Sequence, residues 1–187
     1  MTKTVAAFFL LLFLNGQVFA QKLQYGFKAG PQLSSYTRTT DDKAALRYHF
    51  GAFSSWTVAE QVSVQAEALL SAQGINRVSD SDFKMRTLYL NVPLLARYDF
   101  TERTSAHAGL QAGFLLRAKL KVEGYDTYDR KEAYKPMDLA FSFGGEYRFN
   151  NNIGAGLRFN LGMTSFHRED NEPHQRTVQI FAAYHLR

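Results

Sequence analysis

The chain has 187 residues, which is enough for one domain with a sizeable core and does not require two. Its 22 Lys and Arg exceed its 17 Asp and Glu, but they are scattered and no RNA-binding or helix-turn-helix pattern accompanies them, so we expect no nucleic-acid partner. It contains no cysteine, which excludes a disulfide framework and a cysteine-linked lipid anchor. Its 16 Phe, 10 Tyr and 13 Gly beside only 4 Pro indicate β-structure.

The first 20 residues have the layout of a secretory signal peptide. Lys3 precedes the apolar run Val5–Leu14, and Val18 and Ala20 supply the small residues of a cleavage site. The run is too short for a membrane-spanning helix, which needs roughly 20 apolar residues. We therefore predict removal of residues 1–20 and a single domain, 21–187. Loss of Lys3 leaves 21 basic against 17 acidic residues, a net charge of +4.

After this leader, apolar residues recur at every second position, which is the period of a β-strand and not of a helix. Eight such runs follow in chain order: 25–35, 48–58, 62–72, 88–100, 106–118, 137–149, 153–163 and 178–186. Each is about as long as the 9–11 residues with which a tilted strand crosses a bilayer. An even number of such strands is typical of bacterial single-chain barrels.

The connections between these runs alternate in length. Segments 59–61, 101–104 and 150–152 are short, whereas 36–45, 75–85, 120–135 and 165–175 are long. Short turns at one end and long loops at the other are the pattern of outer-membrane barrels. The sequence therefore predicts an all-β fold, an eight-stranded antiparallel up-and-down transmembrane β-barrel.

Glycine indicates which face of the strands points outward, since a water-soluble barrel would have the same alternation with its apolar face inside. Nine of the 13 glycines lie on the polar face: Gly26, Gly30, Gly51, Gly109, Gly113, Gly144, Gly154, Gly156 and Gly162. Small residues suit a narrow barrel interior, so the apolar face is expected to meet lipid. Aromatic residues near the short turns and termini would form one interfacial girdle: Tyr25, Trp56, Tyr98, Phe100, Tyr147, Phe149 and Tyr184.

Five segments of the chain resemble the PorT-like outer-membrane β-barrels of Bacteroidetes, which are small, porin-like and eight-stranded. They are Phe27–Gly30, Gln65–Gly74, Leu90–Tyr98, Ala108–Leu116 and Leu157–Gly162. The resemblance implies a place in the outer membrane of a Gram-negative bacterium, with periplasmic termini, and for the namesake members a part in protein secretion. It brings no catalytic motif. Two features depart from it: Pro31 interrupts the first strand, and the chain ends on Arg187 where such barrels often finish on an aromatic residue.

Charged residues on the polar face are the main candidate site. They are Lys28, Glu67, Arg97, Arg117, Asp138, Glu146, Arg148 and Arg158. Because buried charges must be paired or solvated, we expect a network that plugs the lumen, with a selectivity lining as the alternative. A turn at 150–152 would place Gly144 opposite Arg158 and make Glu146 the diagonal neighbour of Arg158.

The remaining polar motifs support neither a metal centre nor an enzyme. His167 and His174 match no standard zinc spacing, so we expect no metal and no cofactor. No histidine has a neighbouring nucleophile pattern, and we therefore expect no catalytic residue. Three tyrosines in the third long segment form a candidate binding surface among charged residues: Tyr125, Tyr128 and Tyr134.

These features predict a structural or interaction component of the cell envelope with a lumen filled by side chains. Its partners would be outer-membrane lipid and an envelope or secretion-complex protein, and its long loops would provide surface binding or assistance to secretion. The alternative is a narrow passive pore for small solutes. An eight-stranded interior is just wide enough for its own side chains to fill, which favours the first interpretation.

Overall fold

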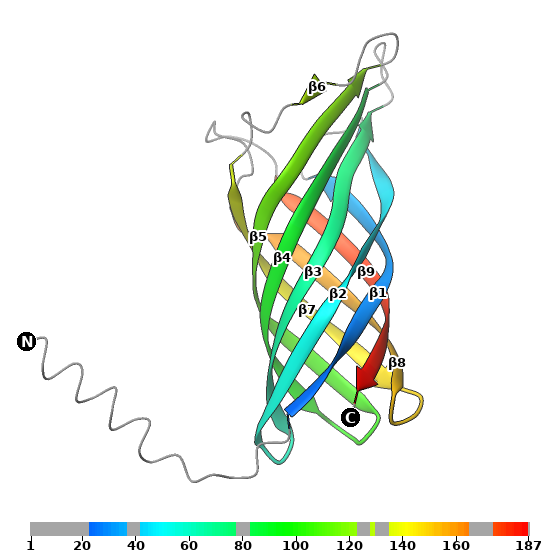
Figure 1. Ribbon diagram of the computed structural model, residues 1–187, viewed down its shortest axis with the longest axis vertical. Coiled ribbons are helices and arrows are strands. Elements are labelled where there is room, and N and C mark those ends of the chain that lie inside the picture. Colours follow the sequence, from blue (N-terminus) through cyan, green and yellow to red (C-terminus); the bar gives the residue numbers. More distant parts are fainter. Residues whose placement is uncertain are drawn as a thin grey trace, which may run out of the picture.

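The computed structural model describes residues 23–36, 42–77, 83–122, 128–129, 135–164 and 174–186. Eight long strands form a closed antiparallel barrel (Figure 1). They are β1 (Leu23–Tyr36), β2 (Asp42–Ala59), β3 (Val62–Arg77), β4 (Phe83–Asp99), β5 (Thr104–Val122), β7 (Met137–Arg148), β8 (Ile153–Gly162) and β9 (Gln175–Leu186). Among the described strands, the short β6 (Tyr128–Asp129) pairs with β5. Each long strand pairs with its neighbours along the chain, and the β1–β9 pairing closes the sheet.

The predicted eight-stranded barrel is confirmed, although several strands are longer than the apolar runs. For example, β2 begins at Asp42 and β5 continues to Val122. The extra residues lie at the end of the barrel opposite the short turns, where backbone pairing continues beyond the apolar runs of the sequence. Alternation of apolar residues therefore marks only part of each of these strands. Among the residues described, no helix is long and apolar enough to cross a membrane.

Three short connections lie at one end of the barrel, together with the start of β1 and the end of β9 (Figure 1). We call this the turn end. In the β7–β8 turn the Asn150 Oδ1 accepts hydrogen bonds from the backbone N–H groups of Asn152 (2.9 Å) and Ile153 (2.8 Å). This side-chain cap sets the hairpin register, and Gly144 pairs with Arg158 as predicted. The strand ends that border the long connections lie at the opposite end, which we call the loop end.

The polar face points into the barrel and the apolar face points out. Lys28, Glu67 and Arg158 are buried, whereas Phe27, Leu94 and Ile180 are 56%, 58% and 58% exposed. Apolar side chains exposed around the whole wall would be unfavourable in water but are suited to lipid.

Pro31 does not end the first strand. β1 continues to Tyr36, and Pro31 keeps its place opposite Tyr48 of β2. The pairing of β1 with β9 is interrupted, however: Ala29 and Gln32 have partners in β9, and the two residues between them do not. Because proline has no N–H to donate, it weakens one side of the ladder locally and leaves the strand intact.

A β-bulge in β5 overturns part of the predicted alternation. Leu115 pairs with Tyr89 and Arg117 pairs with Leu88, so Leu116 is an extra residue without an opposite partner. Beyond it the faces are exchanged: Arg117 is exposed on the outer surface, and Ala118 is buried inside. The expectation that Arg117 faces the lumen is therefore wrong, because counting in steps of two does not register one inserted residue.

Candidate functional site

Five charged side chains meet inside the barrel in the half nearer the turn end. They come from five strands: Lys28 (β1), Glu67 (β3), Arg97 (β4), Glu146 (β7) and Arg158 (β8). The least buried of them, Arg97, is only 6% exposed. We call these five residues the charge cluster.

Glu67 is the acceptor at the centre of the cluster. The Arg158 guanidinium binds it in a bidentate manner, with Nη1 2.7 Å from Oε2 and Nη2 2.7 Å from Oε1. The Lys28 ammonium donates to Oε1 at 3.2 Å, and the Gln65 side-chain amide donates to the same oxygen. A carboxylate removed from water in this way needs several charge-assisted donors, and Glu67 has them from three strands.

Glu146 is the second acid and receives a different set of partners. The Lys28 Nζ lies 3.3 Å from its Oε2, while Arg97 Nη1 lies 3.3 Å and His185 Nε2 2.9 Å from its Oε1. Arg97 also binds Asp99, whose Oδ1 is 3.0 Å from the arginine Nε. Lys28 thus connects both acids, and three cations face three carboxylates.

Two aromatic rings complete the filling of this half of the lumen. Phe53 and Phe181 point inward and are 4% and 2% exposed. The Lys28 Nζ lies 4.9 Å from the centre of the Phe53 ring and 4.5 Å from that of Phe181, in cation–π contact. The Arg158 Nε donates to His107 Nε2 at 3.1 Å beside them. Salt bridges and rings together leave this section of the barrel filled.

Neither ring is among the site residues predicted from the sequence, although the sequence carries a signal for both. Each is close to a glycine of a neighbouring strand: Gly26 pairs with Phe53, and Gly156 pairs with Phe181. A Cβ on Gly26 would lie 2.7 Å from the Phe53 ring, and one on Gly156 would clash with Phe181. An aromatic residue on the polar face opposite a glycine therefore indicates a ring that occupies the space the glycine leaves.

The structure brings five of the eight predicted lumen charges together. Arg117 lies outside. Arg148 is half-buried at the end of β7 and belongs to none of the ion pairs among the described residues. Asp138 lies nearer the loop end, apart from the cluster. The expected diagonal contact of Glu146 with Arg158 is replaced by pairing of Arg158 with Glu67, which is 91 residues away in the chain.

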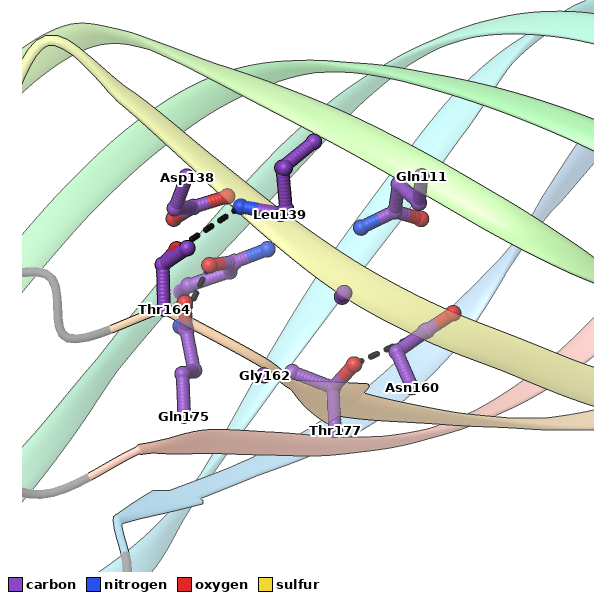
Figure 2. A pocket seen from close by; sticks show the side chains of 10 residues that line it. Gln111, Asp138, Leu139, Asn160, Gly162, Thr164, Gln175 and Thr177 are labelled. Atoms are coloured by element: carbon purple, nitrogen blue, oxygen red, sulfur yellow. Dashed lines mark hydrogen bonds between the residues drawn. The ribbon is translucent and has the colours of Figure 1, made fainter.

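The half of the lumen nearer the loop end is lined mainly by uncharged polar groups. Figure 2 shows a small cavity there, with Asp138, Gln111 and Gln175 pointing toward it. Asn160 Nδ2 donates to Thr177 Oγ1 at 2.8 Å (Figure 2). The Gln175 amide donates to Gln73. The cavity volume is about 20 Å³. That is room for about one water molecule and not for an organic solute.

A layer of amides separates this cavity from the charge cluster. The Gln32 side chain donates to Ser71 Oγ at 2.8 Å and accepts a hydrogen bond from Gln179 Nε2 at 2.8 Å. Gln32 and Gln179 are each 1% exposed. Polar side chains that bind one another therefore occupy the lumen between the charge cluster and this cavity.

The seven predicted girdle residues all lie on the outer surface toward the turn end. Tyr98 packs edge-on against Phe100 with ring centres 5.1 Å apart, and Tyr147 packs in the same way against Phe149 at 5.4 Å. Such rings suit the boundary between lipid and water. Of the three predicted loop tyrosines, Tyr125 and Tyr134 lie outside the described residues, and the backbone of Tyr128 forms part of β6.

A closed antiparallel barrel with an apolar outer surface and a filled polar interior defines a small integral protein of a bacterial outer membrane. Residues 19–168 match the family described as outer membrane protein beta-barrel domain, and the chain belongs to that family. It is thus a β-barrel of the Gram-negative outer membrane. With the usual orientation of such barrels, the turn end is periplasmic and the loop end faces the exterior.

One solved structure shares the fold at low sequence identity, and two others are similar with lower scores. Ail, the attachment invasion locus protein of Yersinia pestis, solved in complex with the heparin analogue sucrose octasulfate, is 14% identical, with a TM-score of 0.56 over 88% of this chain and 99% of Ail. Neisserial surface protein A is 13% identical, with a TM-score of 0.48 over 87% of this chain and 96% of its own. OprG from Pseudomonas aeruginosa is 10% identical, with a TM-score of 0.44 over 89% and 97%. No curated protein sequence matches the chain.

Proposed function

We propose that this protein is a non-conducting structural and interaction component of the outer membrane that engages an envelope or secretion-complex protein, or a surface ligand, through its long outer loops. The observation that carries the proposal is the charge cluster. Its five side chains, from five different strands, are ion-paired across the interior and at most 6% exposed. Because the charge cluster fills the interior near the turn end, we assign contact with protein partners to the long outer loops.

Passage of an ion through the barrel would require several buried pairs to separate at once. The bidentate contact of Arg158 with Glu67 and the contacts of Lys28 with both acids span the lumen. Separating them would leave uncompensated charge in a poorly solvated interior, at a cost of several kcal/mol per ion. The cavity nearer the exterior adds room for about one water only.

Single-channel recording in planar bilayers tests the closed lumen. The parent is expected to show no steady current. Glu146→Ala leaves Lys28 without one of its two acids and Arg97 without its buried one, so a lower unfolding temperature is expected before any current appears. Glu102→Ala, in an exposed turn, is the matched control. The heated and unheated gel mobilities report unfolding. Steady ion-selective conductance of the parent would favour the narrow passive pore instead.

Site-specific crosslinking in native envelopes tests the interaction part. A photo-reactive amino acid at Tyr125 or Tyr134, in a predicted outer loop, is expected to capture a defined envelope protein or surface ligand. The same group at Glu102, in a periplasmic turn, is the control. The resemblance to PorT-like barrels makes a secretion complex the first candidate. An unchanged set of secreted proteins in a deletion strain would remove secretion from the proposal, and absence of any loop-specific product would remove the interaction role.

A further inference from the structure

Three cations stand close together on the outer surface of β4 and β5, just beyond the bulge. Arg86 of β4 and Lys119 of β5 lie opposite each other. Two residues nearer the turn end along each strand, Leu88 of β4 lies opposite Arg117 of β5. All three cations are exposed. In the part of the chain that the structure describes, none of them takes part in an ion pair. The bulge at Leu116 is what turns Arg117 and Lys119 outward.

The cations border a groove on the lipid-facing wall with a volume of about 450 Å³. Ala72 of β3 lies opposite Leu88 of β4, and Leu46 and Tyr48 of β2 line the other side. Leu46 and Tyr48 are 65% and 58% exposed, so both stand out from the wall. The apolar part of the lining, with the small Ala72 among Leu46, Tyr48 and Leu88, borders on the cations, and we call it the apolar channel. The lining also includes Arg47, Gln73 and Thr87.

The level of this groove in the membrane follows from strand geometry. A strand tilted by about 40° climbs roughly 2.6 Å per residue, so an apolar band about 25 Å tall takes about ten residues. Counting from the girdle residue Tyr98 along β4 leads to Leu88, and counting from its partner Ala106 along β5 leads to Leu116. Arg86, Arg117 and Lys119 therefore come at the level where the headgroups of the outer leaflet begin.

We propose that this groove binds a phosphorylated glycolipid of the outer leaflet, with an acyl chain over Ala72 and Leu88 and a phosphate held by Arg86 and Arg117. Guanidinium groups bind phosphate in a bidentate manner, and a second cation nearby strengthens the contact. The apolar channel is continuous with the lipid-facing surface, which favours a lipid over a soluble anion. Because Asp129 of β6 is the backbone partner of Lys119, the two arginines carry the assignment.

The test uses the full folded protein in detergent micelles with diphosphorylated lipid A as the probe. Native mass spectrometry should show a retained lipid A adduct on the parent, and the unfolding temperature should rise with lipid A. The double variant Arg86→Gln with Arg117→Gln should bind about tenfold more weakly or worse. Arg176→Gln, an exposed outward arginine on β9, is the matched control and should bind as the parent does.

Two further measurements distinguish binding of a lipid from binding of a free anion, and the effect of charge from the effect of groove shape. Dephosphorylated lipid A should not raise the unfolding temperature, and inorganic phosphate alone should neither raise it nor displace lipid A. Ala72→Phe fills the channel without changing a charge and should also weaken binding. Unchanged binding of the double arginine variant, equal loss in Arg176→Gln, or displacement by inorganic phosphate would overturn the proposal. Should the double variant fail to fold, the dephosphorylated lipid on the parent decides the same point.

Discussion

Replacement of Glu67 by glutamine is expected to be among the most damaging single changes in the barrel. Glutamine keeps the size of the side chain but removes the charge that Arg158 binds through two contacts of 2.7 Å and Lys28 through one of 3.2 Å. Lys28 retains Glu146 at 3.3 Å, whereas Arg158 forms no other ion pair within the described residues. The variant therefore leaves one guanidinium, 1% exposed, without its counter-ion.

The expected loss of stability follows from one buried cation losing its counter-ion. Removing one partner of a buried ion pair typically costs about 3–5 kcal/mol. We expect a loss of that size from the free energy of unfolding for Glu67→Gln. Arg158→Met should cost less, because Lys28 still faces Glu67 at 3.2 Å. The double variant should cost less than the sum of the two, with a coupling of at least about 1 kcal/mol between the positions.

Urea titration of the barrel folded in phospholipid vesicles measures these values, with the fluorescence of Trp56, the only tryptophan, as the signal. Glu60→Gln, at an exposed position in the β2–β3 turn, is the control and should change the free energy of unfolding by less than about 0.5 kcal/mol. The reasoning fails if Glu67→Gln matches this control, or if the effects of Glu67→Gln and Arg158→Met simply add.

Three other predictions concern the wall, the interior and the leader. Leu110→Arg places a charge on the lipid face near mid-membrane and should cost roughly 2–4 kcal/mol in folding titrations. Gln111→Arg should cost less, because Gln111 lines the same cavity as Asp138. The reverse order would mean that the assignment of inner and outer faces is wrong. Gly26→Ala should cost about 1–3 kcal/mol by overpacking, whereas Gly145→Ala, with its nearest neighbour 3.3 Å away, should be tolerated; equal effects would contradict the packing argument. The intact mass of the protein from envelopes should begin at Gln21, and a mass that includes the leader would exclude cleavage there.

The sequence by itself determined the strands, their faces and the end of the barrel at which the turns lie. These features are local: alternation with period two assigns a face to each residue, and short connections of the Asn150–Asn152 type set the hairpin register between neighbouring strands. The pairing of Gly144 with Arg158 follows directly from that turn.

Tertiary structure alone decided which inward side chains meet and where the alternation is interrupted. Glu67 and Arg158 are 91 residues apart, and they come together because the tilt and stagger of the closed barrel set the height of each strand, which no single hairpin specifies. The bulge at Leu116 has the same origin, since one extra residue in β5 is visible only against the register of β4. It moved Arg117 from the lumen to the membrane surface, because a shift of one residue exchanges the two faces of a strand.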